Sequence, residues 1–293
     1  MDLIVITGPT ASGKTSYAVK YAKEHNGEII NADSMQVYKY MDIGTAKPTM
    51  EEREGIPHFL LDVCDPDVNF SVATYCEMAH KCIKDVVSRG KLPILVGGTG
   101  LYIDSVVNNI TFSDIPKDEE FCELLYKQAL ENGNEYIYKK LQIIDRQAAD
   151  KIELNDTRRI VRALEVYHTT GKTITWHKQN SRKNPSLYNA QIYAFDFERS
   201  ILYDRINRRV DEMIKKGLVE EVENLIKIGV TIDCTSMQGI GYKEILMYLD
   251  GLISFDSAVE MIKQASRRYA KRQLTWFRAN KKINWINPEV LLV

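Results

Sequence analysis

Gly8-Pro9-Thr10-Ala11-Ser12-Gly13-Lys14-Thr15 is a complete G-x-x-x-x-G-K-[ST] sequence, the pattern of a phosphate-binding loop. An apolar run at residues 3–7 precedes it, and a stretch with helical character at residues 16–22 follows it. Between a strand and a helix, the glycines let backbone N–H groups close around phosphate oxygens, and the helix N-terminus adds its positive dipole end. We expect Lys14 to reach a terminal phosphate and the Thr15 hydroxyl to ligate Mg²⁺. The stretch therefore predicts a phosphorylated substrate bound with Mg²⁺.

Length and composition indicate an ordinary globular protein. The 293 residues can form one large α/β domain and a smaller one, and 44% hydrophobic with 27% charged residues is typical of such domains. No apolar run approaches the roughly 20 residues that span a membrane. The first expected strand begins next to Met1, which leaves no room for a signal peptide. We expect a cytoplasmic protein with no membrane partner, and nothing in the chain requires more than a monomer.

Cysteine and histidine are scattered through the chain. The five cysteines include no C-x-x-C pair, and the five histidines include no H-E-x-x-H. These patterns argue against a disulfide framework and against a zinc site.

The predicted strands define the fold class. Apolar runs at residues 28–32, 59–63 and 92–96 alternate with helical stretches, including one at 71–88, and a further strand is expected at 191–195. Continuous apolar strands alternating with helices indicate an α/β fold, a P-loop NTPase-like parallel sheet covered by helices on both faces. Ligands collect at the carboxyl ends of such strands. Asp33 and Thr99 follow two of these ends, so we expect them to face the phosphate-binding loop.

Strand signals stop in the middle of the chain and helical periodicity replaces them. We predict an inserted helical subdomain over residues 113–189. Residues 1–112 and 190–293 would then form the catalytic core, and most of the second segment is a helical C-terminal region.

Two groups of polar residues have a functional and a structural interpretation each. Asp33 could take a proton from an attacking nucleophile, coordinate Mg²⁺ indirectly or cap a turn. Arg205 and Arg209 are four residues apart on one expected helix, so they share a face that suits a pyrophosphate, although a solvated helix would look the same.

The charge of the chain is unevenly distributed. A net charge of −1 argues against a nucleic-acid partner, but eight basic residues and no acidic one lie between Met261 and Lys282. Tyr269, Trp276 and Phe277 are interleaved with them. A basic stretch with aromatic side chains is typical of phosphate contact and base stacking, and a solvated helix face is the alternative.

Taken together, these motifs resemble the tRNA dimethylallyltransferases of bacterial type, also called the IPP transferase family. The resemblance covers nearly the whole chain, and the two stretches at 42–48 and 270–276 are its most specific parts. The matching stretches are residues 8–15, 32–38, 41–48, 57–58, 95–102, 155–156, 159–165, 170–172, 239–242 and 270–276. The chain ends soon after Trp285 without the zinc finger of eukaryotic relatives.

The resemblance implies transfer of a dimethylallyl group from dimethylallyl diphosphate to N6 of adenosine 37 in tRNAs that read codons beginning with U. It makes Asp33 the general base and places Thr99 and Arg209 in the catalytic site. It also makes the diphosphate, together with Mg²⁺ on Thr15, the ligand of Gly8, Pro9, Thr10, Ala11, Ser12, Gly13, Lys14 and Thr15. The residues that the family match assigns to the tRNA anticodon stem-loop are Asp33, Ser34, Met35, Gln36, Arg158, Arg159, Arg162, Gln238, Gly239, Ile240, Gly241, Tyr242, Lys243, Lys271, Arg272, Gln273, Trp276 and Arg278.

Two departures from the family pattern concern the tRNA contact. Glu153-Leu154 stand where many relatives have His-Pro, and residues 118–121 are Asp-Glu-Glu-Phe where relatives often place an arginine. Three other functions are each consistent with part of the pattern: prenyl transfer to free AMP or ADP, phosphorylation of a small metabolite, and RNA binding without catalysis. The first leaves the helical insertion and the basic helix without a role, and the second leaves the basic helix without one. The third leaves the convergence of the loop, Asp33 and Thr99 unexplained.

Overall fold

The computed structural model describes residues 1–112, 115 and 117–287, and it divides into two compact units. The first unit joins Met1–Val107 to Ser186–Val293, and the second is Asn108–Pro185. The predicted insertion, residues 113–189, begins at a residue outside the described ones. In the described part of the chain, no helix is both long and apolar enough to cross a membrane.

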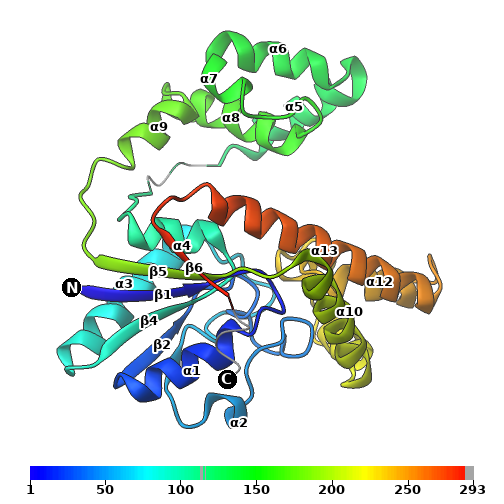
Figure 1. Ribbon diagram of the computed structural model, residues 1–293. Coiled ribbons are helices and arrows are strands. Elements are labelled where there is room, and N and C mark those ends of the chain that lie inside the picture. The colour runs from blue at the N-terminus through cyan, green and yellow to red at the C-terminus, as the bar shows by residue number, and fades with distance from the viewer. Residues whose placement is uncertain (113–114, 116, 288–293) are drawn as a thin grey trace. The chain divides into compact units, whose positions relative to one another are not determined.

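A parallel sheet of six strands forms the centre of the first unit, in the order β3-β2-β4-β1-β5-β6 (Figure 1). This confirms the predicted α/β class. The strands are β1 (Asp2–Thr7), β2 (Gly27–Asn31), β3 (His58–Phe59), β4 (Leu92–Gly97), β5 (Asn189–Phe195) and β6 (Ile283–Ile286). At the centre of the sheet, Ile6 of β1 is in register with Val96 of β4 and with Tyr193 of β5.

Two strands differ from the sequence prediction. The third strand, expected at 59–63, ends at Phe59, because Leu60 and Asp62 have φ angles of 63° and 56° and leave the extended region. The edge strand β6 was not predicted, because four residues after a lysine pair give too short an apolar signal.

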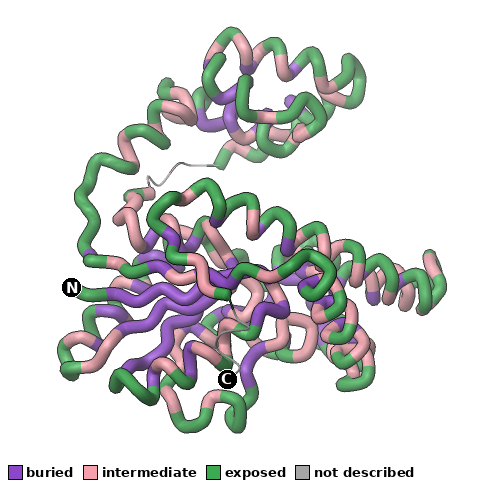
Figure 2. The backbone as a smooth tube through the Cα atoms, in the orientation of Figure 1, coloured by how far each residue is buried: buried purple, intermediate pink, exposed green. Residues whose placement is uncertain are grey.

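Both faces of the sheet are covered. All of β2 and all of β1 after Asp2 are buried, as the purple strands of Figure 2 show. Ile4 and Ile6 pack with α1 (Lys14–Glu24), while Leu3 and Val5, fully buried, point to the opposite face because strand side chains alternate. The other helices of the first half of this unit are α2 (Met50–Arg53), α3 (Val72–Ser88) and α4 (Gly100–Val107).

A second hydrophobic core lies beside the sheet, among the C-terminal helices. These are α10 (Arg199–Lys215), α11 (Leu218–Lys227), α12 (Tyr242–Leu249) and α13 (Phe255–Arg278), with a short turn of 3₁₀ helix at Ser236–Gln238. Val210, Val222, Ile245 and Ile262, one from each long helix, are almost completely buried in it together with Tyr38 of the N-terminal half. The core therefore fixes the segment after β2 against four helices from the other end of the chain.

The described part of the second unit consists of helices and loops. Its helices are α5 (Glu119–Asn132), α6 (Asn134–Ile144), α7 (Arg146–Ala149), α8 (Thr157–Thr170) and α9 (Ile174–Asn180). Leu125, Ile137 and Leu164 are buried in its own core. Asp118, in one of the stretches that depart from the family pattern, caps the N-terminus of α5, and Asp156, two residues after the other, caps α8.

Candidate active site

The phosphate-binding loop lies between β1 and α1, as predicted, and its backbone needs glycine. Gly8 and Gly13 have φ angles of 145° and 82°, and a side chain at Gly8 would also meet Ser12 Oγ at 3.2 Å. Ala11, at φ 61°, is a non-glycine residue in the left-handed region. The Lys14 ammonium lies 3.4 Å from the Pro9 carbonyl oxygen, across the open side of the loop. The loop therefore has the tight shape that surrounds a phosphate.

Asp33 and Thr99 lie at the carboxyl ends of β2 and β4, and hydrogen bonds fix their relation. The Thr99 hydroxyl accepts from the Ser34 N–H at 2.9 Å, and the Thr99 N–H donates to the Ala32 carbonyl at 3.1 Å. Gly97, just before this loop, has no room for a side chain, because an added Cβ would lie 2.1 Å from the Ala32 oxygen. Asn31 Oδ1 accepts from the Asp33 N–H. The two loops thus form one rigid edge.

Gln273 connects this edge to the phosphate-binding loop. Its Oε1 accepts from the Thr10 N–H at 2.9 Å, and its Nε2 donates to the Gly98 carbonyl at 2.9 Å. The residue is only 5% exposed, although its neighbours Lys271 and Arg272 on α13 are exposed. The helix that carries the basic surface therefore also supports the phosphate site.

Arg205 and Arg209, the predicted pair on α10, make different contacts. Arg205 donates to the Ala11 carbonyl at 2.8 Å and stacks on the Phe197 ring, so it holds the phosphate-binding loop from outside. Arg209, one turn later, is half-buried and lines the pocket that contains Lys14 and Asp33. Only Arg209 of the predicted pair faces the place where a ligand would sit.

Two adjoining pockets meet at Asp33. One contains the phosphate-binding loop residues Thr10, Lys14 and Thr15. The other, of about 240 Å³, extends along α10, α12 and α13 and is lined partly by apolar side chains such as Ile206 and Met213. The residues that line both are Thr10, Asp33, Thr45, Arg209 and Tyr269.

The ionisable side chains around Asp33 have shifted pKa values. Burial and the nearby Arg209 lower the pKa of Lys14 to about 8, while the Asp33 carboxylate acts to raise it. Burial also lowers the pKa of Arg209, which Asp33 again raises. Burial raises the pKa of the Tyr269 phenol, Asp33 raises it further, and a hydrogen bond with Thr99 offsets part of this. Asp33 is therefore the acidic group that faces two cations and a phenol in the same site.

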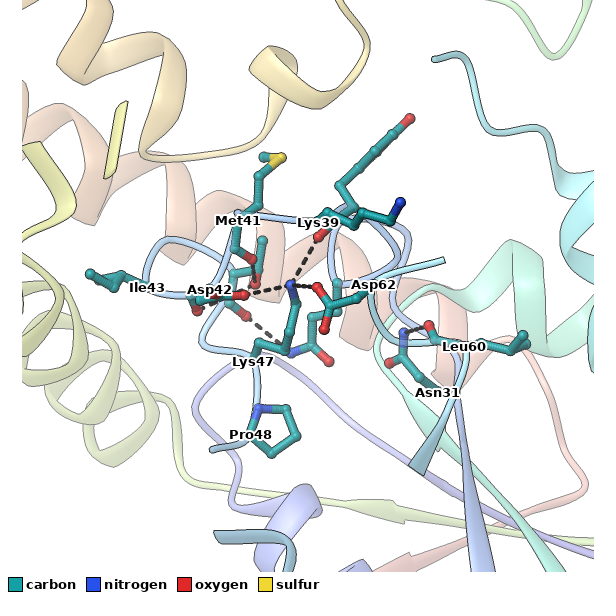
Figure 3. A network of polar contacts seen from close by, with 12 residues as sticks. Asn31, Lys39, Met41, Asp42, Ile43, Lys47, Pro48, Leu60 and Asp62 are labelled. Carbon is teal, nitrogen blue, oxygen red and sulfur yellow. Dashed lines mark hydrogen bonds and ion pairs between the residues drawn. The ribbon is translucent and has the colours of Figure 1, made fainter. Parts of the chain in front are cut away.

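The segment 42–47 contributes Thr45 to both pockets and Gly44 to the second, and it is held at several points. The buried Lys47 ammonium contacts Asp42 Oδ1 at 2.6 Å, Asp62 Oδ1 at 2.5 Å and the Tyr38 carbonyl oxygen at 2.8 Å (Figure 3). The Gln36 amide donates to the carbonyls of Thr45 and Ala46. A buried ammonium with three oxygen partners fixes the local backbone.

The structure brings together many of the residues that the family match assigned to tRNA. Those that line the second pocket are Asp33, Ser34, Met35, Gln238, Gly239, Ile240, Tyr242 and Arg272. Lys243, Lys271, Trp276 and Arg278 are exposed, and Arg278 forms an ion pair with Asp196 at 3.2 Å. Arg158, Arg159 and Arg162 lie on α8 of the second unit, where Arg162 pairs with Glu165 at 2.6 Å.

A divalent cation in the first pocket would have few protein ligands. Over the ranges that the structure describes, no group of three or more His, Cys, Asp or Glu side chains is arranged to hold a metal. Thr15 lines the pocket beside Lys14 and Asp33. Mg²⁺ commonly takes one or two protein oxygens with substrate phosphates and water, so this set is compatible with it.

The sequence does not reveal the amide role of Gln273 or the hydrogen bonds from the 42–44 backbone to the Glu221 carboxylate, because each contact joins segments more than 170 residues apart. Lys47 was missed too: its partners Tyr38, Asp42 and Asp62 lie within 15 residues, but they lie in irregular loops that have no sequence periodicity. Tyr269 was noted as an aromatic residue in a basic stretch, but the same stretch does not predict that it lines both pockets.

Comparisons with known proteins agree with this geometry. A sequence model of the family "IPP transferase" matches residues 36–280. A tRNA dimethylallyltransferase of Acetivibrio thermocellus is 54% identical over 98% of this chain and 92% of its own, and one of Thermoanaerobacter pseudethanolicus is 56% identical over 97% and 91%.

Solved structures resemble the chain over the same length. The tRNA isopentenylpyrophosphate transferase of Bacillus halodurans matches with a TM-score of 0.73 and 45% identity, covering 98% of this chain and 89% of that one. A eukaryotic dimethylallyltransferase acting on tRNA matches with a TM-score of 0.83 and 30% identity, covering 98% and 74%. Because the family pattern and these identities extend over nearly all of its length, the chain belongs to the IPP transferase family.

Proposed function

We propose that this enzyme transfers the dimethylallyl group of dimethylallyl diphosphate to N6 of adenosine 37 in tRNAs that read codons beginning with U. The products are N6-dimethylallyladenosine in the tRNA and free diphosphate. The observation that carries the proposal is the position of Asp33 on the wall shared by two pockets. One pocket has a phosphate-binding loop and the other adjoins the basic helix α13, so two different substrates can meet at this carboxylate.

The phosphate side supports departure of the diphosphate. Lys14 and Arg209 line the same pocket, so with the backbone N–H groups of the loop they would stabilise the negative charge that develops on the leaving diphosphate. Mg²⁺ held by Thr15 and the phosphate oxygens would supply further stabilisation of that charge. Gln273 keeps the loop in place by accepting the Thr10 N–H.

The reaction itself needs a proton acceptor beside the adenine. The N6 nitrogen forms a bond to C1 of the dimethylallyl group while the C1–O bond to diphosphate breaks, and the electron pair of that bond leaves with the diphosphate. The nitrogen must then lose one proton. Asp33 is the carboxylate that lines both pockets, so it is placed to accept that proton. Thr99, tied to the Ser34 N–H, fixes the loop that carries Asp33.

The adenine that accepts the dimethylallyl group must leave its stacked position in the tRNA to enter the site. A base in an anticodon loop can reach Asp33 only when it is flipped out, and the second pocket offers it an aromatic ring, Tyr269, and apolar walls. Exposed Lys271, Arg272 and Trp276 of α13 offer phosphate contact and stacking to the rest of the loop. We assign the arginines of α8 to the tRNA backbone by the family match.

The test offers labelled dimethylallyl diphosphate and Mg²⁺ to the enzyme with three acceptors. These are an unmodified tRNA with adenosines 36 and 37, the same tRNA with guanosine 37, and free AMP. The proposal predicts label in the first acceptor only. Label in AMP would make the enzyme a free-nucleotide prenyltransferase, and label in none of the three would refute prenyl transfer.

A further inference from the structure

The Glu221 carboxylate is saturated with hydrogen bonds from one backbone turn and one tyrosine. Its Oε2 accepts from the N–H groups of Asp42 at 2.8 Å and Ile43 at 2.7 Å. Its Oε1 accepts from the Gly44 N–H at 3.0 Å and from the Tyr242 hydroxyl at 2.6 Å. Three successive N–H groups converging on one carboxylate form an anion-binding concavity, here filled by a side chain of the same protein.

This carboxylate brings together two parts of the chain that line the second pocket. Gly44 and Tyr242 both line it, whereas Glu221 lines neither pocket. The Tyr242 ring packs directly on the Gly44 backbone, because a Cβ added to Gly44 would lie 2.6 Å from the ring. Burial raises the pKa of the Tyr242 phenol, and Glu221 raises it further, so the phenol stays a donor to the carboxylate.

Thr45 and its hydrogen bond with Gln36 connect Gly44 to the loop that carries Asp33. Thr45, next to Gly44, lines both pockets together with Asp33. Its carbonyl accepts from the Gln36 amide, three residues after Asp33. At the other end of the segment, Lys47 contacts Asp42 within the segment and Asp62 outside it, so Asp62 fixes this end without involving Glu221 (Figure 3). A displacement at Gly44 therefore changes the pocket wall opposite Asp33 without releasing the whole segment.

We infer that Glu221 is a positioning residue for the transfer reaction, which sets the distance between the 44–45 wall and Asp33 through the Gly44–Tyr242 contact. The inference rests on the proposed function. Transfer needs two reactants aligned at Asp33, and a misplacement of about 1 Å in such a site can lower a rate by about 100-fold. Glu221 lies outside both pocket linings, so its loss should affect alignment rather than direct substrate binding.

The substitution Glu221→Gln tests this with little change in volume. Each carboxylate oxygen accepts from two donors, so either orientation of the amide places an NH₂ group against two donors. Gly44→Ala disturbs the same contact from the other side, by steric overlap with Tyr242. Glu220→Gln is the matched control, because Glu220 is the exposed neighbour on α11 and lies outside both pocket linings.

The experiment measures three quantities for the wild type, the three single variants and the double variant of Gly44 and Glu221. They are the single-turnover rate of transfer with saturating tRNA, the Kd and stoichiometry for inorganic diphosphate, and the thermal midpoint. The diphosphate measurement counts correctly folded sites without relying on transfer.

We expect Glu221→Gln and Gly44→Ala each to lower the turnover rate at least about tenfold per folded site, with the diphosphate Kd changed by less than about twofold. The double variant should be no slower than the slower single variant, because both changes break one contact. A Glu221→Gln rate per folded site equal to that of Glu220→Gln would overturn the inference, as would rate losses that multiply in the double variant. A wild type without any transfer would instead refute the proposed function.

Discussion

The Gln273 side-chain oxygen accepts a hydrogen bond from the Thr10 backbone N–H, with 2.9 Å between oxygen and nitrogen, although 263 residues separate the two in the chain. The same amide donates to the Gly98 carbonyl at 2.9 Å, so one residue of α13 joins the phosphate-binding loop to the loop of Thr99. The phosphate site and the basic helix are thus parts of one hydrogen-bonded assembly. The buried face of α13 thus supports the phosphate-binding loop, while its exposed face carries the basic side chains Lys271 and Arg272.

Replacing Gln273 by leucine should reduce stability and diphosphate affinity together. The leucine fills the space but leaves the Thr10 N–H and the Gly98 carbonyl without partners, which costs about 2 kcal/mol of unfolding free energy. Denaturant unfolding and calorimetry with diphosphate measure the two effects. Thr275→Ala, an exposed change on the same helix, is the control and should alter neither. A Gln273→Leu protein with wild-type stability would contradict the structural role given to the amide.

Diphosphate binding should weaken above a pH of about 8. Burial and Arg209 lower the pKa of Lys14 to about 8, so in the free protein its ammonium is charged below this pH and loses its proton above it. A bound diphosphate favours the charged form, so binding above pH 8 requires uptake of a proton and affinity falls by up to about tenfold per pH unit. Calorimetry at several pH values measures this.

The control for the pH effect is Lys14→Arg, because arginine keeps its charge throughout this range. The difference in slope between the wild type and this variant isolates Lys14 from the titration of diphosphate itself. Identical slopes would show that Lys14 does not change its protonation on binding.

The double change Lys271→Ala and Arg272→Ala should raise the KM for tRNA and reduce its dependence on salt. Both residues are exposed on α13, and removing two phosphate contacts lowers the slope of log KM against log salt concentration by about 1.5. The kinetics are measured from low to moderate salt. A Lys20→Ala, Lys84→Ala protein loses the same charge from α1 and α3 and should retain the wild-type slope. An unchanged slope in the α13 variant would remove that helix from the tRNA interface.

Much of the sheet could be predicted because its strands are locally distinct. The runs at residues 3–7, 28–32 and 92–96 are mostly apolar, and all of their residues except Leu92 are buried, so their pattern needs no knowledge of the rest of the fold. The third strand was overestimated because its apolar residues continue past Phe59, while the backbone turns at Leu60. A hydropathy pattern does not show where the backbone takes a positive φ angle, so it could not locate the end of this strand.

The parts of the candidate site that belong to a recognisable sequence motif could be predicted. The parts that depend on contacts between distant segments could not. The phosphate-binding loop, Asp33 and Thr99 follow strand ends, and parallel topology places such ends at one edge. The helical spacing did not distinguish Arg205 from Arg209, and only the family resemblance selected Arg209; in the structure Arg205 donates to the Ala11 carbonyl and Arg209 lines the pocket. Glu221 lies 177 residues from Gly44, and an acidic residue on an amphipathic helix carries no local sign of such a contact.

The role of Asp33 as the proton acceptor is tested most directly by measuring transfer and diphosphate binding separately. Single-turnover transfer to tRNA and calorimetric binding of diphosphate are measured for Asp33→Asn, with the exposed Asp67→Asn as the control. We expect a transfer rate at least about 100-fold lower in Asp33→Asn, with diphosphate affinity within about twofold of the wild type. A transfer rate close to that of the control would contradict this role, and so would a loss of diphosphate affinity as large as the loss of rate.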